Sequence, residues 1–421
     1  MNTRTLTLAL GSACLGLALW ASALPVGHAD SSDHELARQA LQQGKETLAV
    51  VGLGYVGLPL AVALSRHMKV LGFDISAQRV KELQDGHDRT REVDDGKLQA
   101  ADVRYTCDPA ELKQAAVIIV AVPTPIDGHR SPDLTPVVGA SKTVGQNMSR
   151  GCVVVYESTV YPGLTEEICV PILERESGLT FGKDFTIGYS PERINPGDKV
   201  NTLKNITKIV SGMTPEVCEE IGKVYKLAVD NIFPVSSIKV AESAKLLENT
   251  QRDINIALMN EAAMMFNSIG ISTKEVVDAM NTKWNALGFR PGLVGGHCIG
   301  VDPYYLIYKA SLDSSRSELV STARQINDGM SRFVVDVILN KMIVERHALK
   351  NDKIYFFGIT FKGNCPDTRN SRAIDILKLL RKYDLTPIVV DPYVDKDQLM
   401  RDYGLQAMNF SDVQSITDAD C

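Results

Sequence analysis

Residues 47–57 read Thr47-Leu-Ala-Val-Val-Gly-Leu-Gly-Tyr-Val-Gly57, a short apolar run that leads directly into a G-x-G-x-x-G turn. Apolar residues with helical spacing follow over 58–66, and a second apolar run, 69–73, ends in Asp74. A strand, a glycine turn, a helix and a second strand ending in an acid predict a dinucleotide-binding Rossmann unit. The alternative is a glycine-rich turn that binds no ligand.

The three glycines of this turn, Gly52, Gly54 and Gly57, have separate tasks in such a unit. They allow the tight turn, the approach of a pyrophosphate to backbone N–H groups, and close packing of the helix on the strand. Asp74 is expected to hydrogen-bond the ribose hydroxyls. Because its charge repels a 2′-phosphate and no arginine follows it directly, the sequence favours NAD over NADP.

Three later apolar runs predict further buried strands, each followed by a polar loop. The runs are 115–122, 152–156 and about 185–188, and the loops are Pro123-Thr-Pro125, Glu157-Ser-Thr159 and Tyr189-Ser-Pro-Glu-Arg-Ile-Asn-Pro-Gly-Asp198. The carboxyl ends of parallel strands share one edge of a sheet, where α/β proteins bind ligands. These loops therefore either contact a ligand at that edge or are solvated connections.

The middle of the chain predicts a long helix. Apolar residues recur at three- and four-residue spacings over 236–268 without a proline, which corresponds to about 45 Å and suggests a spine between two domains. Lys245, Asn249 and Asp253 lie near one face of it. Apolar neighbours flank the first two, whereas we expect Asp253 to belong to a solvated stripe. A further helical region covers 318–342.

Between these helices lies Gly292-Leu-Val-Gly-Gly-His-Cys298-Ile-Gly-Val-Asp302-Pro-Tyr-Tyr305. Its glycines let the backbone approach a ligand closely, and they hold one thiol, Cys298, four residues before a carboxylate, Asp302. Such a segment suits a covalent catalytic site. The alternative is a surface turn that contains a cysteine.

A second α/β unit begins near residue 353, with strands predicted over 354–358 and 386–391 and a helix over 373–383. It resembles a second nucleotide-binding half, with Lys362 and Arg369 as cations suited to phosphates. The last five residues read as the approach to one more strand, so we expect the last domain to be incomplete.

The bulk composition excludes several classes of protein. The chain has 421 residues, a net charge of −6 and eight cysteines without C-x-x-C pairs. We therefore expect no nucleic-acid partner and no metal site. The length indicates several domains, and we divide the chain into a leader with its linker, 1–46, and three domains, 47–230, 231–340 and 341–421. Residues 1–29 resemble a signal peptide. Because the following domain needs a cytosolic dinucleotide, we expect a cytoplasmic protein, and membrane association only if this leader is a real anchor.

Taken together, the motifs resemble those of the UDP-glucose/GDP-mannose dehydrogenase family over residues 47–420. The resemblance is carried by the glycine turn, by the three polar loops, and by Ala244-Lys-Leu-Leu-Glu-Asn-Thr250, Gly295-Gly-His-Cys298 and Thr360-Phe-Lys362 with Asp367-Thr-Arg369. Within the family, the segments 189–198, 248–253 and 292–305 look most like UDP-N-acetylhexosamine 6-dehydrogenases of capsule and O-antigen synthesis.

This resemblance implies an α/β fold with an N-terminal Rossmann NAD-binding domain, a central helical domain and a C-terminal Rossmann-like UDP-binding domain. It also implies NAD-dependent oxidation of the C6 alcohol of a UDP-sugar to a carboxylate, and homodimers packed through the long helix. Removing four electrons from one carbon requires two hydride transfers. A thiol that holds the intermediate aldehyde as a thiohemiacetal, later a thioester, prevents its escape.

Residue roles follow from the same resemblance. Cys298 is the nucleophile, Lys245 and Asn249 stabilise the oxyanion, Asp302 and Thr159 hold the water that acts as base, and Glu192 assists thioester hydrolysis. The implied cofactor-binding residues are Gly52, Gly54, Gly57, Asp74, Arg79, Thr124, Thr159 and Arg369. The implied substrate-binding residues are Tyr189, Arg193, Lys245, Gly295 and Lys362.

Three rival functions remain open at this point. The chain could be a UDP-glucose 6-dehydrogenase of the same family. A one-step hydroxyacid dehydrogenase shares the Rossmann unit and a Lys-x-x-x-Asn helix, but it needs neither Cys298 nor a UDP-binding domain. A non-catalytic protein that binds NAD or a nucleotide sugar would not need Cys298, Lys245, Asn249 and Asp302 together.

Overall fold

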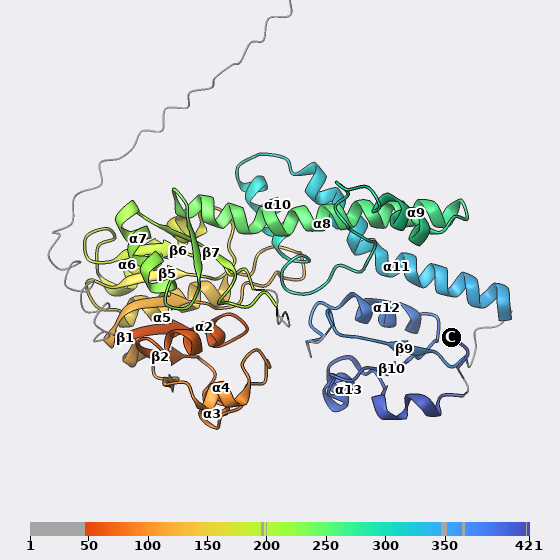
Figure 1. The fold of residues 1–421 in the computed structure, drawn as a ribbon, viewed down its shortest axis with the longest axis horizontal. Coiled ribbons are helices and arrows are strands. Elements are labelled where there is room, and N and C mark those ends of the chain that lie inside the picture. Colours follow the sequence, from red (N-terminus) through yellow and green to blue (C-terminus); the bar gives the residue numbers. More distant parts are fainter. Residues whose placement is uncertain (1–46, 195–197, 199, 347–351, 364–366, 418) are drawn as a thin grey trace, which may run out of the picture.

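The computed structural model describes residues 47–194, 198, 200–346, 352–363, 367–417 and 419–421. The signal-like leader and the helix expected over 31–45 lie outside these residues. Figure 1 shows a large sheet with its helices, a set of long helices, and a small sheet with helices of its own. This arrangement confirms the predicted α/β fold class, with a helical middle between a large, mostly parallel sheet and a small parallel sheet.

The large sheet has the strand order β3-β2-β1-β4-β5-β6-β7-β8. From β3 to β6 all neighbours are parallel, whereas β7 pairs antiparallel with β6 and parallel with β8. The strands are Thr47–Val51 (β1), Lys69–Phe73 (β2), Val103–Thr106 (β3), Ala115–Val120 (β4), Val153–Tyr156 (β5), Thr186–Tyr189 (β6), Thr207–Gly212 (β7) and Asn231–Pro234 (β8). The strand order reverses between β1 and β4, and such a point is where doubly wound sheets bind ligands.

Alternate residues of the buried strands pack on opposite faces of this sheet. On β1, Leu48 and Val50 join one core and Ala49 and Val51 join the other. A strand buried on both faces carries no polar alternation, which is why it is visible in the sequence as a continuous apolar run. The covering helices are Gly57–Leu64 (α2), Ala77–Gln84 (α3), Asp95–Gln99 (α4), Thr135–Asn147 (α5), Val170–Ser177 (α6) and Pro215–Tyr225 (α7), with a 3-10 turn Pro109–Gln114 (η1) and a π-helical turn Thr165–Cys169 (η2).

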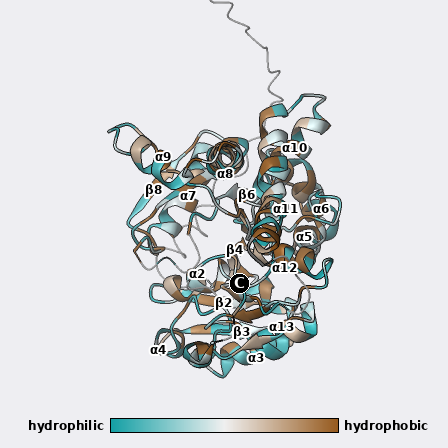
Figure 2. Cartoon of the chain, turned by 90° about the vertical axis from the view of Figure 1, so that its right-hand side faces the viewer, coloured by the Kyte–Doolittle hydropathy of each residue, from teal (hydrophilic) through white to brown (hydrophobic). Residues whose placement is uncertain are grey.

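The helical middle is built on α8, Ile238–Ser268, as the sequence predicts. Ser237 caps its start by accepting a hydrogen bond from the Val240 backbone N–H at 3.3 Å. With 31 residues, the helix is about 46 Å long. Figure 2 looks along this helix, with α9 (Thr273–Met280) and α10 (Asp302–Leu312) on either side of it. The second long helix, α11 (Glu318–Arg346), packs along α8.

The small sheet is parallel, in the order β11-β10-β9. Its elements are Tyr355–Phe357 (β9), Arg372–Arg381 (α12), Ile388–Val390 (β10), Lys396–Tyr403 (α13), Ala407–Met408 (β11) and a 3-10 turn Phe410–Ser415 (η3). One of its two cores includes Val335 and Leu339 of α11, so this unit is anchored to the helical middle. The carbonyl of Cys421 accepts a hydrogen bond from the Tyr355 N–H at 2.9 Å, which places the end of the chain beside β9.

The apolar pattern located the strongly buried strands but missed weaker elements. The strands β3, β7 and β8 and most of the short helices have no counterpart in the sequence-based prediction. β8 shows the reason, because three of its four residues are exposed and a proline ends it. The strand expected over 115–122 ends two residues earlier, at Val120.

Nowhere in the described ranges is there a helix with both the length and the apolar composition needed to cross a bilayer.

Candidate active site

The glycine turn after β1 has the geometry that a dinucleotide requires. Gly52 has φ +94°, and a Cβ there would lie 2.8 Å from the Ala121 carbonyl oxygen. A Cβ on Gly57 would lie 1.9 Å from the carbonyl oxygen of Gly52, so only glycine lets α2 pack this closely. By contrast, a Cβ on Gly54 would meet nothing within 4 Å. The open space at this position fits the approach of a pyrophosphate to the start of α2.

Asp74 and Arg79 support this turn from β2 and α3. The carboxylate of Asp74 accepts hydrogen bonds from the backbone N–H groups of Leu53 and Ser76, both at 2.9 Å. The buried Arg79 donates from Nε to the Leu53 carbonyl at 2.9 Å and pairs with Asp88 at 2.8 Å. Asp74 thus binds the N–H of Leu53 and Arg79 binds its carbonyl, and together they fix the turn. Asp74 lies at the end of β2, where a ribose is expected.

Cys298 lies just before α10. Charged side chains from three segments of the chain act on the pKa of its thiol. Burial raises the pKa of the thiol, and the charge of Lys245 on α8 lowers it in part. The charges of Asp302 and of Glu192, which follows β6, raise it further. The structure thus brings together four of the six residues expected in catalysis. Asn249 joins them through Asp302.

Asp302 is fully buried at the start of α10. Its carboxylate accepts a hydrogen bond from Nδ2 of Asn249 at 2.5 Å. Burial raises the pKa of Asp302 to about 6, although the Lys245 charge and the Asn249 hydrogen bond act in the opposite direction. A carboxyl group with this pKa exchanges its proton near neutral pH, as a general base must.

Lys245 is buried, yet no described residue forms a hydrogen bond or an ion pair with its ammonium group. A buried cation without such a partner is poised to bind an anion or an oxyanion. Arg252, to which the sequence assigned no role, donates to the side-chain oxygen of Asn249. This contact orients the Asn249 amide so that its nitrogen faces Asp302. The i, i+3 spacing of the two residues is the sequence signal for it.

The expectation that Asp253 is solvated is wrong. The side chain is fully buried, 2.6 Å from Nη1 of Arg324 and 2.7 Å from Nδ2 of Asn327, both on α11. The spacing on α8 correctly placed Asp253 on one face with Lys245, but that face is covered by α11. A buried ion pair of this kind joins the two long helices.

Asp328 connects all three parts of the chain. It pairs with Arg324 on its own helix, with Arg130 from the loop after β4 at 3.0 Å, and with Arg372 at the start of α12. The Tyr304 hydroxyl of α10 donates to the same carboxylate at 2.5 Å. Burial opposes its ionisation, but these cations lower the pKa of Asp328. The carboxylate therefore stays charged and ties the large sheet and the small sheet to the helical middle.

A second contact between distant segments lies beside Cys298. Asp367 accepts hydrogen bonds from Arg369 at 2.6 Å, from the Tyr55 hydroxyl of the glycine turn at 3.3 Å, and lies 2.9 Å from Nε2 of His297. Burial works against ionisation, but the hydrogen bonds from His297 and Arg369 outweigh it and lower the pKa of Asp367. The expected cofactor residue Arg369 is thus brought to the glycine turn.

Several predicted site residues make structural contacts in this structure. Tyr189 is fully buried in the core and donates to the Ser158 carbonyl at 3.2 Å, so its ring is not a surface for substrate. Gly295 allows close approach of the small unit, since a Cβ there would lie 2.6 Å from the Asn370 carbonyl oxygen. Thr124 accepts a hydrogen bond from the Tyr305 hydroxyl through its carbonyl at 3.0 Å.

The remaining predicted residues lie in loops near the large sheet and the small one. Thr159 is half-buried beyond the end of β5. Arg193 donates to the Thr207 carbonyl at 3.4 Å. The charge of Lys362 helps to lower the pKa of Asp198 to about 2, after hydrogen bonds from Asn201 and Val200. The charge of Lys362 in the small unit thus acts on Asp198, which lies in the segment after β6.

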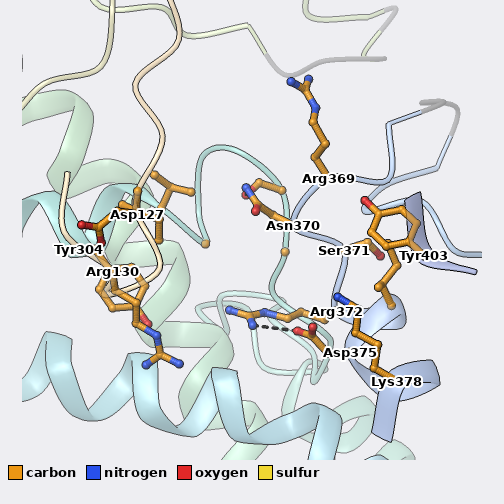
Figure 3. Close-up of a pocket in the computed structure, with 16 residues that line it drawn as sticks. Asp127, Arg130, Tyr304, Arg369, Asn370, Ser371, Arg372, Asp375, Lys378 and Tyr403 are labelled. Atoms are coloured by element: carbon orange, nitrogen blue, oxygen red, sulfur yellow. Dashed lines mark hydrogen bonds and ion pairs between the residues drawn. The ribbon is translucent and has the colours of Figure 1, made fainter. Parts of the chain in front are cut away.

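A cavity of about 450 Å³ adjoins the glycine-rich loop. Figure 3 shows Arg130 and Tyr304 on one side of it and Lys378 and Tyr403 on the other. Its other lining residues include Asp127, Gly295, Gly296, Arg369, Arg372 and Asp375. The two acids offset part of its positive charge, and Arg372 is paired with Asp375 at 3.1 Å. The cavity is not lined by the expected catalytic residues Cys298, Lys245, Asn249 and Asp302, and it therefore lies beside them.

Comparison with known proteins gives matches along most of the chain. Models described as the NAD binding, central and UDP binding domains of the UDP-glucose/GDP-mannose dehydrogenase family match residues 46–229, 239–329 and 355–421. Protein CapL of Staphylococcus aureus is 50% identical over 88% of this chain and 87% of its own length. A UDP-N-acetyl-D-glucosamine 6-dehydrogenase of Pseudomonas aeruginosa is 50% identical over 85% of each chain.

Among solved structures, a UDP-N-acetyl-D-mannosamine dehydrogenase of Pyrococcus horikoshii superimposes with a TM-score of 0.76 and 34% identity, over 83% of this chain and 84% of that one.

Proposed function

Because the chain belongs to the UDP-glucose/GDP-mannose dehydrogenase family, we propose that it oxidises the C6 alcohol of a UDP-N-acetylhexosamine to the uronic acid, for a capsule or O-antigen precursor. The chain is an NAD-dependent oxidoreductase. The observation that carries the proposal is the convergence of Lys245, Asp302 and Glu192 on Cys298. A one-step dehydrogenase has no use for the half-buried thiol at this point, and a non-catalytic binding protein has no use for the four residues together.

NAD, when bound at the glycine turn, accepts the hydride in each of two oxidations. In the first, C6 loses a hydride and its hydroxyl loses a proton to a water held by Thr159 and Asp302. Lys245 and the Asn249 amide stabilise the negative charge that develops on the oxygen. Asp302 serves this water as an anion, and its pKa of about 6 makes it one at neutral pH.

Cys298 then forms a bond from sulfur to C6 of the aldehyde, and the thiol proton passes to the former carbonyl oxygen. The resulting thiohemiacetal keeps the sugar on the enzyme. Loss of a second hydride from C6 and of the hydroxyl proton converts it to a thioester. Since burial raises the pKa of Cys298, the ammonium of Lys245 is the group that makes the thiolate accessible.

Hydrolysis of the thioester completes the reaction. A water gives up a proton to Glu192 and attacks C6, the C–S bond breaks, and the leaving sulfur regains a proton. Glu192 suits this role because its charge acts on Cys298 from the loop after β6. Its carboxylate also accepts a hydrogen bond from the Arg193 N–H at 2.5 Å, which fixes its direction.

Purified protein should release two NADH for each sugar acid and should prefer UDP-N-acetylglucosamine or UDP-N-acetylgalactosamine to UDP-glucose by at least tenfold in kcat/KM. Tenfold corresponds to about 1.4 kcal/mol of transition-state discrimination. The measurement follows NADH absorbance with the three sugars, and with NAD and NADP in parallel. A tenfold preference for UDP-glucose would replace the proposed substrate by the alternative of the same family.

We also propose the division of the chain into an NAD-binding domain over 47–230, a central domain over 231–340 and a UDP-binding domain over 341–421. The separate core of the small sheet supports the last domain. The large sheet continues through β8 to Pro234 and α11 continues to Arg346, so these two elements cross the proposed boundaries by a few residues. A cytoplasmic location is proposed as well, because both the cofactor and nucleotide sugars are cytosolic metabolites of the kind this domain pair binds.

A homodimer is the further part of the proposal. Val240, Leu247, Leu258 and Met265 are exposed on α8, at steps of 7, 11 and 7 residues, which keeps them within about 20° of one another around the helix. Trp284, in the segment that follows α9, is 90% exposed. A line of exposed apolar residues on one helix, here interrupted by Gln251, is typical of a buried interface, and a second copy of the same helix would cover it.

Changing Leu247 and Leu258 to lysine should convert the dimer to a monomer, because four charges would then lie in each two-fold interface. Light scattering after size-exclusion chromatography measures the mass. Val344→Lys is the control, since Val344 is more exposed than either leucine and lies near the end of α11. An unchanged mass in the double variant, or a monomeric parent protein, contradicts this interface.

A further inference from the structure

Lys208 lies on β7, inside the large sheet, and its side chain is fully buried. Lysine is almost never fully buried unless its charge is paired, because moving an ammonium out of water costs several kcal/mol. The two residues that follow it along β7, Ile209 and Val210, are buried and apolar. An apolar side chain would therefore suit this position in a purely structural sheet.

Two carboxylates and a phenol surround the Lys208 ammonium. Its Nζ lies 2.8 Å from Oε2 of Glu157 and 3.4 Å from Oε2 of Glu192. It also lies 5.3 Å from the ring centre of Tyr225, whose hydroxyl donates to the other oxygen of Glu157. These are the titratable groups that face Lys208 from β5, β6 and α7 in the described part of the chain.

The strand directions explain why these groups meet. Glu157 follows β5 and Glu192 follows β6, beyond the carboxyl ends of two parallel strands. Because β7 runs antiparallel to β6, Lys208 at its beginning lies at the same edge of the sheet. Glu192 is the member of this group whose charge acts on Cys298, and Lys208 links it to Glu157.

The charges of the group do not balance, since two carboxylates share one ammonium. Burial raises the pKa of Glu157, whereas the two carboxylates raise the pKa of Lys208 against the effect of burial. The raised pKa of Lys208 keeps its ammonium group charged. Glu192 has one oxygen toward Lys208 and the other toward the backbone N–H groups of Arg193 and Ile194.

We propose that Lys208 is a positioning residue for hydrolysis, which fixes the Glu192 carboxylate beside the thioester on Cys298, and that Glu157 sets how much of the Lys208 charge Glu192 receives. This inference rests on the proposed function, in which Glu192 takes the proton from the attacking water. In that step the oxygen of water bonds to C6, its proton goes to Glu192, the C–S bond breaks, and the sulfur leaves as a thiolate that regains the proton.

In a plot of the rate of thioester hydrolysis against pH, the rate falls on the acid side. Lys208→Met should move this acid limb to higher pH by at least one unit. Without the ammonium, two carboxylates remain side by side in a buried place, so a proton stays on the pair at neutral pH. Glu157→Gln should move the same limb to lower pH, because Lys208 then faces Glu192 alone. Shifts of opposite sign are a signature that a merely structural role does not produce.

The experiment mixes enzyme, excess NAD and a limiting amount of UDP-N-acetylglucosamine at a series of pH values. Acid quenching and intact-protein mass measure the adduct on Cys298, and chromatography measures the free acid. At pH 7, the adduct should persist at least tenfold longer in Lys208→Met than in the parent. Two NADH should still form per site, since both oxidations precede hydrolysis. Lys208→Arg, which retains the charge, should recover most of the rate.

The two proposals fail in different ways. If the parent protein makes no NADH from any UDP-sugar, the proposed function fails, and the variants are not needed. If the parent is active and both single variants keep the parent's acid limb, or shift it in the same direction, the role of Lys208 is overturned. Should Lys208→Met not fold, Glu157→Gln decides alone: a shift to lower pH supports the role and an unchanged limb removes it.

Discussion

Cys298→Ser is expected to lower turnover to the uronic acid by at least about 10³-fold, while leaving NAD binding unchanged. A serine hydroxyl has a far higher pKa than a thiol, and the ester it would form is opened by water less readily than a thioester. Binding of NAD should persist because the turn at Gly52, Gly54 and Gly57 lies in another segment and keeps its geometry. Fluorescence titration with NAD and the NADH yield per sugar measure the two effects.

What the enzyme releases is the sharper observable. The parent protein should yield two NADH per sugar and no free aldehyde, since sulfur holds the carbon between the two oxidations. The serine variant should yield at most one NADH, with an aldehyde that hydrazine reagents trap. Cys107→Ser is the control, because Cys107 is an exposed free thiol near β3. Two NADH per sugar at a near-parental rate in Cys298→Ser would show that the loop is only a turn.

The sequence predicted the frame of the fold because its main strands are buried on both faces. β5 is an unbroken apolar run, and β1 and β2 are polar only at their first residue. Because α8 also has regular apolar spacing without proline, these elements could be located to within a few residues. Elements such as β7 could not. Lys208 in the short run of β7 argues against an inner strand. Its presence there is explained by Glu157 and Glu192, which follow other strands and pair with it.

The candidate site was predictable to the extent that its residues lie in motifs. Cys298, Lys245, Asn249, Asp302 and Glu192 come from such motifs, and the structure brings them together.

Residues that support these groups were not predictable, because their roles depend on which surface packs on which. The 3.6-residue period places Asp253 on a helix face but does not say that Arg324 of α11 covers it. Likewise, the ring of Tyr189 lies in the core although its loop is part of the site.

Asp302→Asn is expected to make the protein more stable at neutral pH and to lower turnover by at least about 100-fold. Burial raises the pKa of Asp302 from 3.8 to about 6, so the folded protein binds this proton more tightly than the unfolded chain does. Stability is therefore greatest below the unfolded pKa and falls as pH rises through the window from about 4 to about 6. At 1.36 kcal/mol per pH unit, ionisation of Asp302 at pH 7 opposes folding by about 3 kcal/mol.

Removing that charge recovers this free energy, provided the side-chain oxygen of the introduced amide still accepts the hydrogen bond that Asn249 donates to Asp302 in the parent. The stability gain over the parent should thus be absent at pH 4, grow through pH 6 and reach its full size at pH 7, which urea unfolding at each pH measures. Turnover should move the other way, because a neutral amide does not polarise the water that takes the alcohol proton. Asp313→Asn, at the exposed end of the same helix α10, should change neither property. A gain of equal size at every pH would trace the effect to packing, and a loss of stability at pH 7 would mean that the ionised Asp302 holds the loop together as well as serving the reaction.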